Sequence, residues 1–193
     1  MKRICVFCGS SAGADPVFAE AARETGETLV RHKLGLVYGG GNIGMMGLLA
    51  DAVLAQRGEV IGVIPQALVD KELAHRGLTE LRIVGSMHER KAMMAELADG
   101  FIALPGGYGT LEEFCEVLTW AQLGLHRKPC GLLNTSGFYD PLLAQIDHAV
   151  RNGFIREQHR ACLVVDARPA ALLERLRLVH PPAIHKWIDR DQT

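Results

Sequence analysis

The sequence predicts an α/β protein in which helices cover both faces of a parallel sheet. Short runs of apolar and β-branched residues alternate with longer helical patterns almost from end to end. The short runs are apolar at nearly every position, as strands are when both faces of their sheet are covered. With 193 residues, 48% of them hydrophobic, the chain is long enough to bury one full core. Right-handed crossovers between such strands predict a Rossmann-like, doubly wound arrangement of three layers, α/β/α.

Each predicted strand is followed by a helical stretch. The strand runs, which include RICVFC, GLVY, EVIGVI, GFIAL and CLVV, place strands at 3–8, 35–38, 59–64, 80–84, 100–104, 129–133 and 162–165. Helices are expected near 16–32, 44–57, 87–98, 111–124, 138–152 and 168–179. No repeat or linker divides the chain, so we assign residues 1–180 to one domain. Residues 181–193 begin with two prolines and are expected to form an irregular tail.

The composition argues against several classes of partner. Lys and Arg number 21 against 22 Asp and Glu, so no basic field favours nucleic acid or an anionic membrane. The apolar runs are far shorter than the ~18 residues that cross a bilayer, and the start MKRICVFCGS does not resemble a secretory signal. The five cysteines are an odd number and lie mostly in apolar runs, which suits reduced thiols in the cytoplasm. We therefore expect a cytoplasmic protein that binds neither nucleic acid nor membrane.

A metal or redox centre is not predicted either. Cys5 and Cys8 form a C-x-x-C pair, but both lie within one strand and no second pair exists. The eight histidines show no metal-ligand spacing. We expect no metal and no cofactor.

The first glycine-rich segment, residues 39–44, reads GGGNIG between a strand and a helix. It fits G-x-G-x-x-G, so its backbone N–H groups either cradle a phosphate or its glycines serve only close packing of strand and helix. A dinucleotide site would need an acidic residue at the end of the next strand. That strand ends in Val63-Ile64-Pro65 instead, which disfavours NAD.

The second glycine-rich segment, PGGYGT at residues 105–110, opens the next long helix. It is not a Walker A loop, because no Gly-Lys-Ser/Thr follows. Three glycines in four residues let successive N–H groups converge into a nest for a phosphate monoester, with the Thr110 hydroxyl as a further donor. We favour phosphate binding here over a purely structural turn.

Glu113 has a structural and a functional interpretation. Thr110-Leu111-Glu112-Glu113 fits a capping box, in which Thr110 caps the helix and Glu113 reaches back to its N–H. On a helical period, however, Glu113 shares its side with apolar residues, whereas Glu112 lies with Glu116 and Thr119. A carboxylate near a helix N-terminus is stabilised in its charged form, which suits an electrostatic or general-base role better than an acid role.

Two neighbouring cations precede this segment. Ser86 and Glu89 fit another capping box, so Glu89 is interpreted as structural. Arg90 shares a helical face with Met93 and Met94, which directs a permanent charge toward the core. Its side chain either runs along the apolar stripe to solvent or holds a guanidinium at the rim of a pocket. Lys91 adds a second cation at the ligand-binding edge of the sheet.

Taken in order, CVFCGSS, VYGGGNIGMMG, IGVIP, SMHERKAMM and PGGYGTLEE resemble the LOG family of cytokinin riboside 5′-monophosphate phosphoribohydrolases. Members of that family are often labelled possible lysine decarboxylases, and the resemblance covers residues 3–165. It implies a Rossmann-like homodimer that takes a nucleoside 5′-monophosphate. The implied reaction is hydrolysis of the N-glycosidic bond of AMP or N6-modified AMP, which releases the base and ribose 5-phosphate.

The resemblance also implies a set of site residues. Arg90 and Glu113 match the catalytic pair, and Lys91 would assist Arg90. The residues that match substrate-binding positions are Glu72, Lys91, Gly106, Gly107, Tyr108, Gly109, Thr110, Leu111, Glu112 and Thr119. Met93 departs from the pattern, because many relatives carry glutamate there.

The implied chemistry agrees with the residues themselves. Cleavage of the ribosyl bond builds positive charge on the sugar, which an ionised Glu113 would stabilise in the transition state while also orienting the attacking water. No acid for the departing base is evident, although His88 and Tyr108 lie nearby in sequence. The exposed side of helix 111–124, with Trp120 and Leu123, is the expected dimer face.

Two other functions compete with this one. The first is a non-catalytic carrier of a nucleotide or phosphoester on the same fold. The second is a pyridoxal-phosphate lysine decarboxylase, for which no lysine lies in a suitable context.

Overall fold

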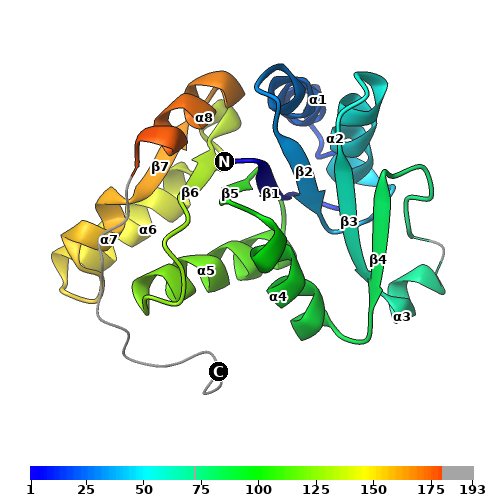
Figure 1. Cartoon of the computed structure of the whole chain (residues 1–193). Coiled ribbons are helices and arrows are strands. Elements are labelled where there is room, and N and C mark those ends of the chain that lie inside the picture. Colours follow the sequence, from blue (N-terminus) through cyan, green and yellow to red (C-terminus); the bar gives the residue numbers. More distant parts are fainter. Residues whose placement is uncertain (72, 180–193) are drawn as a thin grey trace.

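The computed structural model describes residues 1–71 and 73–179 and contains one seven-stranded sheet (Figure 1). Its strands are β1 (Arg3–Phe7), β2 (Gly35–Tyr38), β3 (Val60–Pro65), β4 (Glu80–Val84), β5 (Gly100–Ala103), β6 (Cys130–Leu133) and β7 (Leu163–Asp166). They lie in the order β4-β3-β2-β1-β5-β6-β7, and every neighbouring pair is parallel. The predicted doubly wound α/β fold is confirmed. The predicted tail at 181–193 lies outside the described residues, as does Glu72.

All six predicted helices are present. They are α1 (Pro16–Arg31), α2 (Gly44–Ala55), α4 (Met87–Leu97), α5 (Tyr108–Gln122), α6 (Asp140–Arg151) and α8 (Pro169–Leu178). The sequence pattern missed α3 (Gln66–Val69), α7 (Glu157–Ala161) and the 3₁₀ turn η1 (Thr135–Gly137), because so few residues cannot display a helical period. Within the described residues, no helix combines the length and the apolar character needed to span a bilayer.

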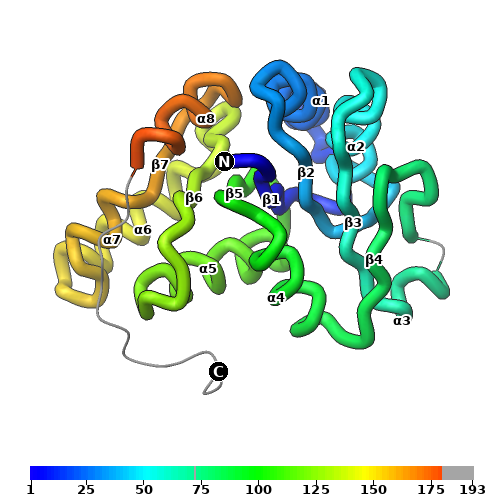
Figure 2. The backbone as a smooth tube through the Cα atoms, viewed as in Figure 1, coloured from blue at the N-terminus to red at the C-terminus, as the bar shows by residue number. Residues whose placement is uncertain are grey.

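The helices form two layers around the sheet. Helices α1, α2 and α8 cover one face, and α4, α5 and α6 cover the other (Figures 1 and 2). Successive strand residues alternate between the two cores, so that Ile4 belongs to the same core as Leu49 of α2 while Cys5 belongs to the same core as Met94 of α4. Both faces are therefore dry, which explains the near-continuous apolar runs of the strands.

The position of the site follows from the order of the strands. From β1 the chain builds outward through β2, β3 and β4, then returns to β5 on the other side of β1. At such a switch point the loops after the two central strands leave in opposite directions and open a crevice at their carboxyl ends. The pairing of Phe7 with Ala103 brings the loop after β1 beside the loop after β5, and the Gly9 N–H donates to the Pro105 carbonyl at 3.1 Å.

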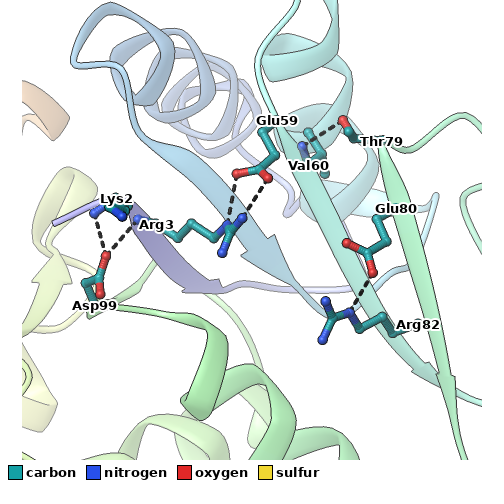
Figure 3. A network of polar contacts seen from close by, with 8 residues as sticks. All are labelled: Lys2, Arg3, Glu59, Val60, Thr79, Glu80, Arg82 and Asp99. Atoms are coloured by element: carbon teal, nitrogen blue, oxygen red, sulfur yellow. Dashed lines mark hydrogen bonds and ion pairs between the residues drawn. The ribbon is translucent and has the colours of Figure 1, made fainter.

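Charged residues fasten the opposite edge of the sheet, as Figure 3 shows. The Arg3 guanidinium binds both carboxylate oxygens of Glu59, at 2.9 and 2.8 Å, and so links β1 to the start of β3. The Asp99 carboxylate accepts from the backbone N–H groups of Lys2 and Arg3. These groups are partly exposed and lie at the amino ends of the strands, away from the crevice.

Candidate active site

A hollow of about 280 Å³ lies at the carboxyl ends of β1 and β5. Its walls come from the end of β1, from the loops after β1, β2 and β5, and from the first two turns of α2, α4 and α5. Seven of the predicted site residues line it: Arg90, Gly107, Tyr108, Gly109, Thr110, Glu112 and Glu113. Residues from two glycine loops and one carboxylate-bearing helix therefore meet at the crevice that the topology creates.

Helix α5 begins earlier than the sequence pattern predicts. Its first residue is Tyr108, and Gly107 is its N-cap without any side-chain cap. Thr110 therefore lies inside the first turn, and the predicted Thr110–Glu113 capping box is wrong. Gly107 and Gly109 border open space, since a Cβ at either position would meet no atom within 4 Å. The first-turn N–H groups, which have no intrahelical acceptor, are thus left beside the hollow for an anion.

Gly106 serves a different purpose from the glycines that follow it. A Cβ on Gly106 would lie 2.1 Å from the Thr110 hydroxyl oxygen and 2.9 Å from the Gly9 nitrogen. Only glycine lets these three segments approach so closely. Gly106 borders a second hollow of about 370 Å³, which adjoins the first and has Phe18 and Phe138 among its walls.

Arg90 lies in the hollow and does not run to solvent. Its side chain is buried, and its Nε donates to the Val63 carbonyl at 3.1 Å. One guanidinium nitrogen, Nη2, lies above Gly39, where a Cβ would be only 2.0 Å away. The other, Nη1, lies 3.4 Å from Glu113 Oε1. The glycine after β2 therefore makes room for the arginine.

Glu113 is buried in the second turn of α5, with only 9% of its surface exposed. Its Oε1 atom is buried without a hydrogen-bond partner. Burial raises the pKa of Glu113 above its ordinary value, and the opposing attraction of Arg90 does not cancel that effect. The expectation of a carboxylate stabilised by the helix N-terminus is wrong, because α5 starts at Tyr108 and the helix-end effect fades beyond the first turn. Glu113 is suited to exchange a proton as well as to carry charge.

Lys91 faces α5 and does not line the hollow. Its ammonium contacts Glu112 at 2.5 Å and Glu116 at 3.1 Å. Desolvation lowers the pKa of Lys91, but the two carboxylates outweigh it and raise the pKa above its ordinary value. The structure thus assigns Lys91 to an ionic link between α4 and α5, rather than to direct contact with the hollow.

Other predicted residues lie elsewhere. Leu111 packs against the core beneath α5. The Thr119 hydroxyl donates to the Cys115 carbonyl at 2.8 Å, and Thr119 lines a separate groove with Leu142 and Ile146 of α6. Met93 packs against the core, and neither it nor the exposed His88 lines the hollow. Ser86 caps α4 as predicted, because its hydroxyl accepts from the Glu89 N–H, but the Glu89 carboxylate accepts from the Gly85 N–H instead of closing the box at Ser86.

Several lining residues were not predicted as site residues. They are Val6, Phe7, Cys8, Gly9, Ser10, Gly39, Met46, Met87 and Met94. Their common signal is position, since most of them follow a strand or begin a helix at the carboxyl edge of the sheet. Gly39 was interpreted as part of a phosphate or packing motif. The structure favours packing at that motif, since the carbonyl carbon of Ser10 would lie 2.3 Å from a Cβ on Gly44.

The fold and the site define a Rossmann-like protein with an anion-receptive helix start that faces a buried arginine–glutamate pair. The family model described as "Possible lysine decarboxylase" matches residues 46–176. Cytokinin riboside 5′-monophosphate phosphoribohydrolase LOG7 of Arabidopsis thaliana is 52% identical over 180 residues, which cover 93% of this chain and 83% of the relative. The rice enzyme (Oryza sativa subsp. japonica) named LOG is 56% identical over 163 residues, which cover 84% of this chain and 67% of the relative. The chain belongs to the LOG family, as its motifs indicated.

Solved structures with the same fold are more distant in sequence. The molybdenum cofactor binding protein of Rippkaea orientalis matches with a TM-score of 0.69 at 22% identity, over 92% of this chain and 97% of that one. The molybdenum cofactor carrier protein of Chlamydomonas reinhardtii matches with a TM-score of 0.67 at 21% identity, over 92% and 99%. At this identity the likeness concerns the fold.

Proposed function

We propose that this protein hydrolyses the N-glycosidic bond of a nucleoside 5′-monophosphate, AMP or an N6-modified AMP, to the free base and ribose 5-phosphate. The observation that carries the proposal is the buried Glu113 carboxyl beside Arg90, in a hollow whose wall includes the open start of α5. The names of its LOG relatives, which are phosphoribohydrolases of cytokinin riboside 5′-monophosphates, support the same reaction.

The geometry suggests how the residues divide the work. The phosphate would bind the first-turn N–H groups of α5 near Gly107 and Gly109, which places the ribose toward Glu113. As the bond between the base nitrogen and C1′ breaks, the ionised carboxylate stabilises the positive sugar ring. Water then bonds to C1′ and gives a proton to Glu113, while the departing base takes up a proton from solvent. The charge of Arg90 lowers the pKa of Glu113 against the larger, opposite effect of burial, and so favours the ionised carboxylate.

The first test measures base release and the role of Glu113. Wild-type protein should release free base from AMP or isopentenyl-AMP, and chromatography measures that base. Glu113→Gln should lower kcat at least ~100-fold, because the variant lacks both the negative charge and the proton acceptor. Glu116→Gln is the matched control, since this carboxylate of the same helix pairs with Lys91 and does not line the hollow. We expect Glu113→Gln to keep most of its affinity for the nucleotide.

The outcomes separate the competing functions. Saturable nucleotide binding without base release would favour the non-catalytic carrier, and full activity in Glu113→Gln would remove this residue from the mechanism. A lysine decarboxylase is disfavoured, because the described residues that line the hollow include no lysine.

We also propose that the protein is a cytoplasmic homodimer that associates through the outer side of α5. Trp120 is partly exposed on this helix and Leu123 is partly exposed at its C-cap, and a mainly apolar groove runs between α5 and α6. The free cysteines agree with a reducing compartment. Sedimentation that finds only monomers would contradict the dimer, and recovery in a membrane or secreted fraction would contradict the location.

A further inference from the structure

The short loop that joins β5 to α5 is fixed at two successive carbonyl groups. The Leu104 carbonyl accepts a hydrogen bond from the Tyr139 hydroxyl at 2.6 Å. The next carbonyl, that of Pro105, accepts from the Gly9 N–H at 3.1 Å. Leu104 is fully buried, so its carbonyl would otherwise lack water as well as a strand partner. Two protein donors therefore set the path of the chain just before the open start of α5.

Tyr139 itself is held rigidly. It is 1% exposed, and its backbone N–H donates to the Asn134 side-chain oxygen at 2.7 Å. Asn134 also donates to Asp140 at 2.7 Å, and the Phe138 ring meets the Tyr139 ring edge-on at 5.0 Å. Tyr139 does not line the hollow beside Arg90, and its hydrogen bond to Leu104 links it to the loop before α5.

Such an anchor is needed because the segment it precedes is conformationally permissive. Gly106, Gly107 and Gly109 impose little preference on φ and ψ, so the sequence alone does not fix where the N–H groups point. An anion site gains affinity when its donors are held in the bound orientation before the ligand arrives. The hydroxyl of Tyr139 fixes the Leu104–Pro105 peptide, three residues before the N-cap Gly107.

We propose that Tyr139 is a positioning residue that pre-orients the α5 N-terminus for the phosphate of the substrate. This inference rests on the proposed function, which places the phosphate there. It assigns the role to the hydroxyl group alone, because the ring fills the core and does not reach the hollow.

The structure offers a matched control. Tyr38 is fully buried, and its hydroxyl donates to the Gly41 carbonyl at 3.1 Å, in the other glycine loop. Tyr38→Phe and Tyr139→Phe each remove one buried hydroxyl and leave one buried carbonyl unpaired. The two variants should lose similar thermal stability, so a difference in ligand binding reports position rather than general loosening.

The test is calorimetric titration of each protein with ribose 5-phosphate, together with steady-state kinetics on AMP. Tyr139→Phe should weaken ribose 5-phosphate about fivefold and raise KM by a similar factor, with kcat within about twofold of wild type. Tyr38→Phe should keep the wild-type Kd. Equal Kd values for Tyr139→Phe and wild type, or equal losses in both variants, would overturn the inference. Wild-type protein that hydrolyses AMP but does not bind ribose 5-phosphate would overturn it too, whereas absence of hydrolysis would contradict the proposed function itself.

Discussion

At the scale of single residues, the surroundings of Glu113 decide its chemistry. The sequence places a carboxylate near a helix N-terminus, where charge is normally favoured. In the structure, Glu113 lies in the second turn of α5, where it is buried and its Oε1 atom has no hydrogen-bond partner. Arg90 offsets only part of the desolvation, so the pKa of Glu113 lies above its ordinary value. The same burial that makes the group useful in the mechanism makes its ionised form costly to the fold.

A consequence for stability follows from that raised pKa. A group whose pKa is raised in the folded state stabilises the fold fully at pH values below its unfolded-state pKa. For the Glu113 carboxyl, this stabilising free energy is lost as pH rises through the folded-state pKa. Glu113→Gln should therefore have a higher Tm than wild type near pH 7, with a difference that shrinks toward pH 4. Thermal melts of both proteins between pH 4 and 8 check this, with the exposed Glu112→Gln as control. A difference that stays constant with pH would contradict the argument.

At the scale of elements, the loop after β2 and helix α4 meet at one glycine. Gly39 admits the Arg90 guanidinium, which reaches across from α4 to the Val63 carbonyl at the end of β3. The site therefore depends on the spacing of two elements that are far apart in the sequence. The G-x-G-x-x-G pattern indicates close packing at this turn, but it does not identify the arginine as the group that the glycine accommodates.

Gly39→Ala tests this contact between elements. The new Cβ would overlap Arg90 Nη2, the end of a flexible side chain, so Arg90 should move while the fold survives. We expect kcat to fall about 100-fold, as misplacement by about 1 Å can cause, with little change in Tm. Gly41→Ala in the same loop is the control, because its Cβ would meet the end of the Met46 side chain instead. Steady-state kinetics on AMP give the answer, and a Gly39→Ala variant with wild-type kcat would show that Arg90 tolerates displacement.

The elements also show what could be predicted from the sequence and what could not. Strands and long helices follow from period and apolar runs, because burial on both faces leaves a strong pattern. The start of α5 was misplaced by three residues, since T-x-x-E is a good capping signal but Gly107 and Gly109 let the chain turn into the helix earlier. The partners of Lys91 were not predicted either. The helical period shows that Glu112 and Glu116 share one face of their helix, but it does not show which element packs against that face.

At the scale of the whole molecule, the amino ends and the carboxyl ends of the strands serve different purposes. Ion pairs and backbone contacts fasten the amino edge, where Arg3, Glu59 and Asp99 meet (Figure 3). The carboxyl edge keeps its glycine loops open around the hollow. Among the predicted site residues that do not line the hollow, Thr119 lies far along α5. Thr119 lies six residues beyond Glu113, roughly 9 Å further along α5, and lines another groove.

If Thr119 contacts substrate, a second copy must supply it to the hollow. Mixing two inactive variants tests that arrangement. Consider a mixed dimer of one Glu113→Gln chain and one Thr119→Val chain. The Thr119→Val chain still supplies Glu113 and the Glu113→Gln chain still supplies Thr119, so the site that combines these two residues is intact. Random reassembly makes half of the dimers mixed, each with one intact site of two, so about one quarter of wild-type activity should return. No recovery would mean that each chain uses its own Thr119, and an active Thr119→Val variant would remove this residue from the site.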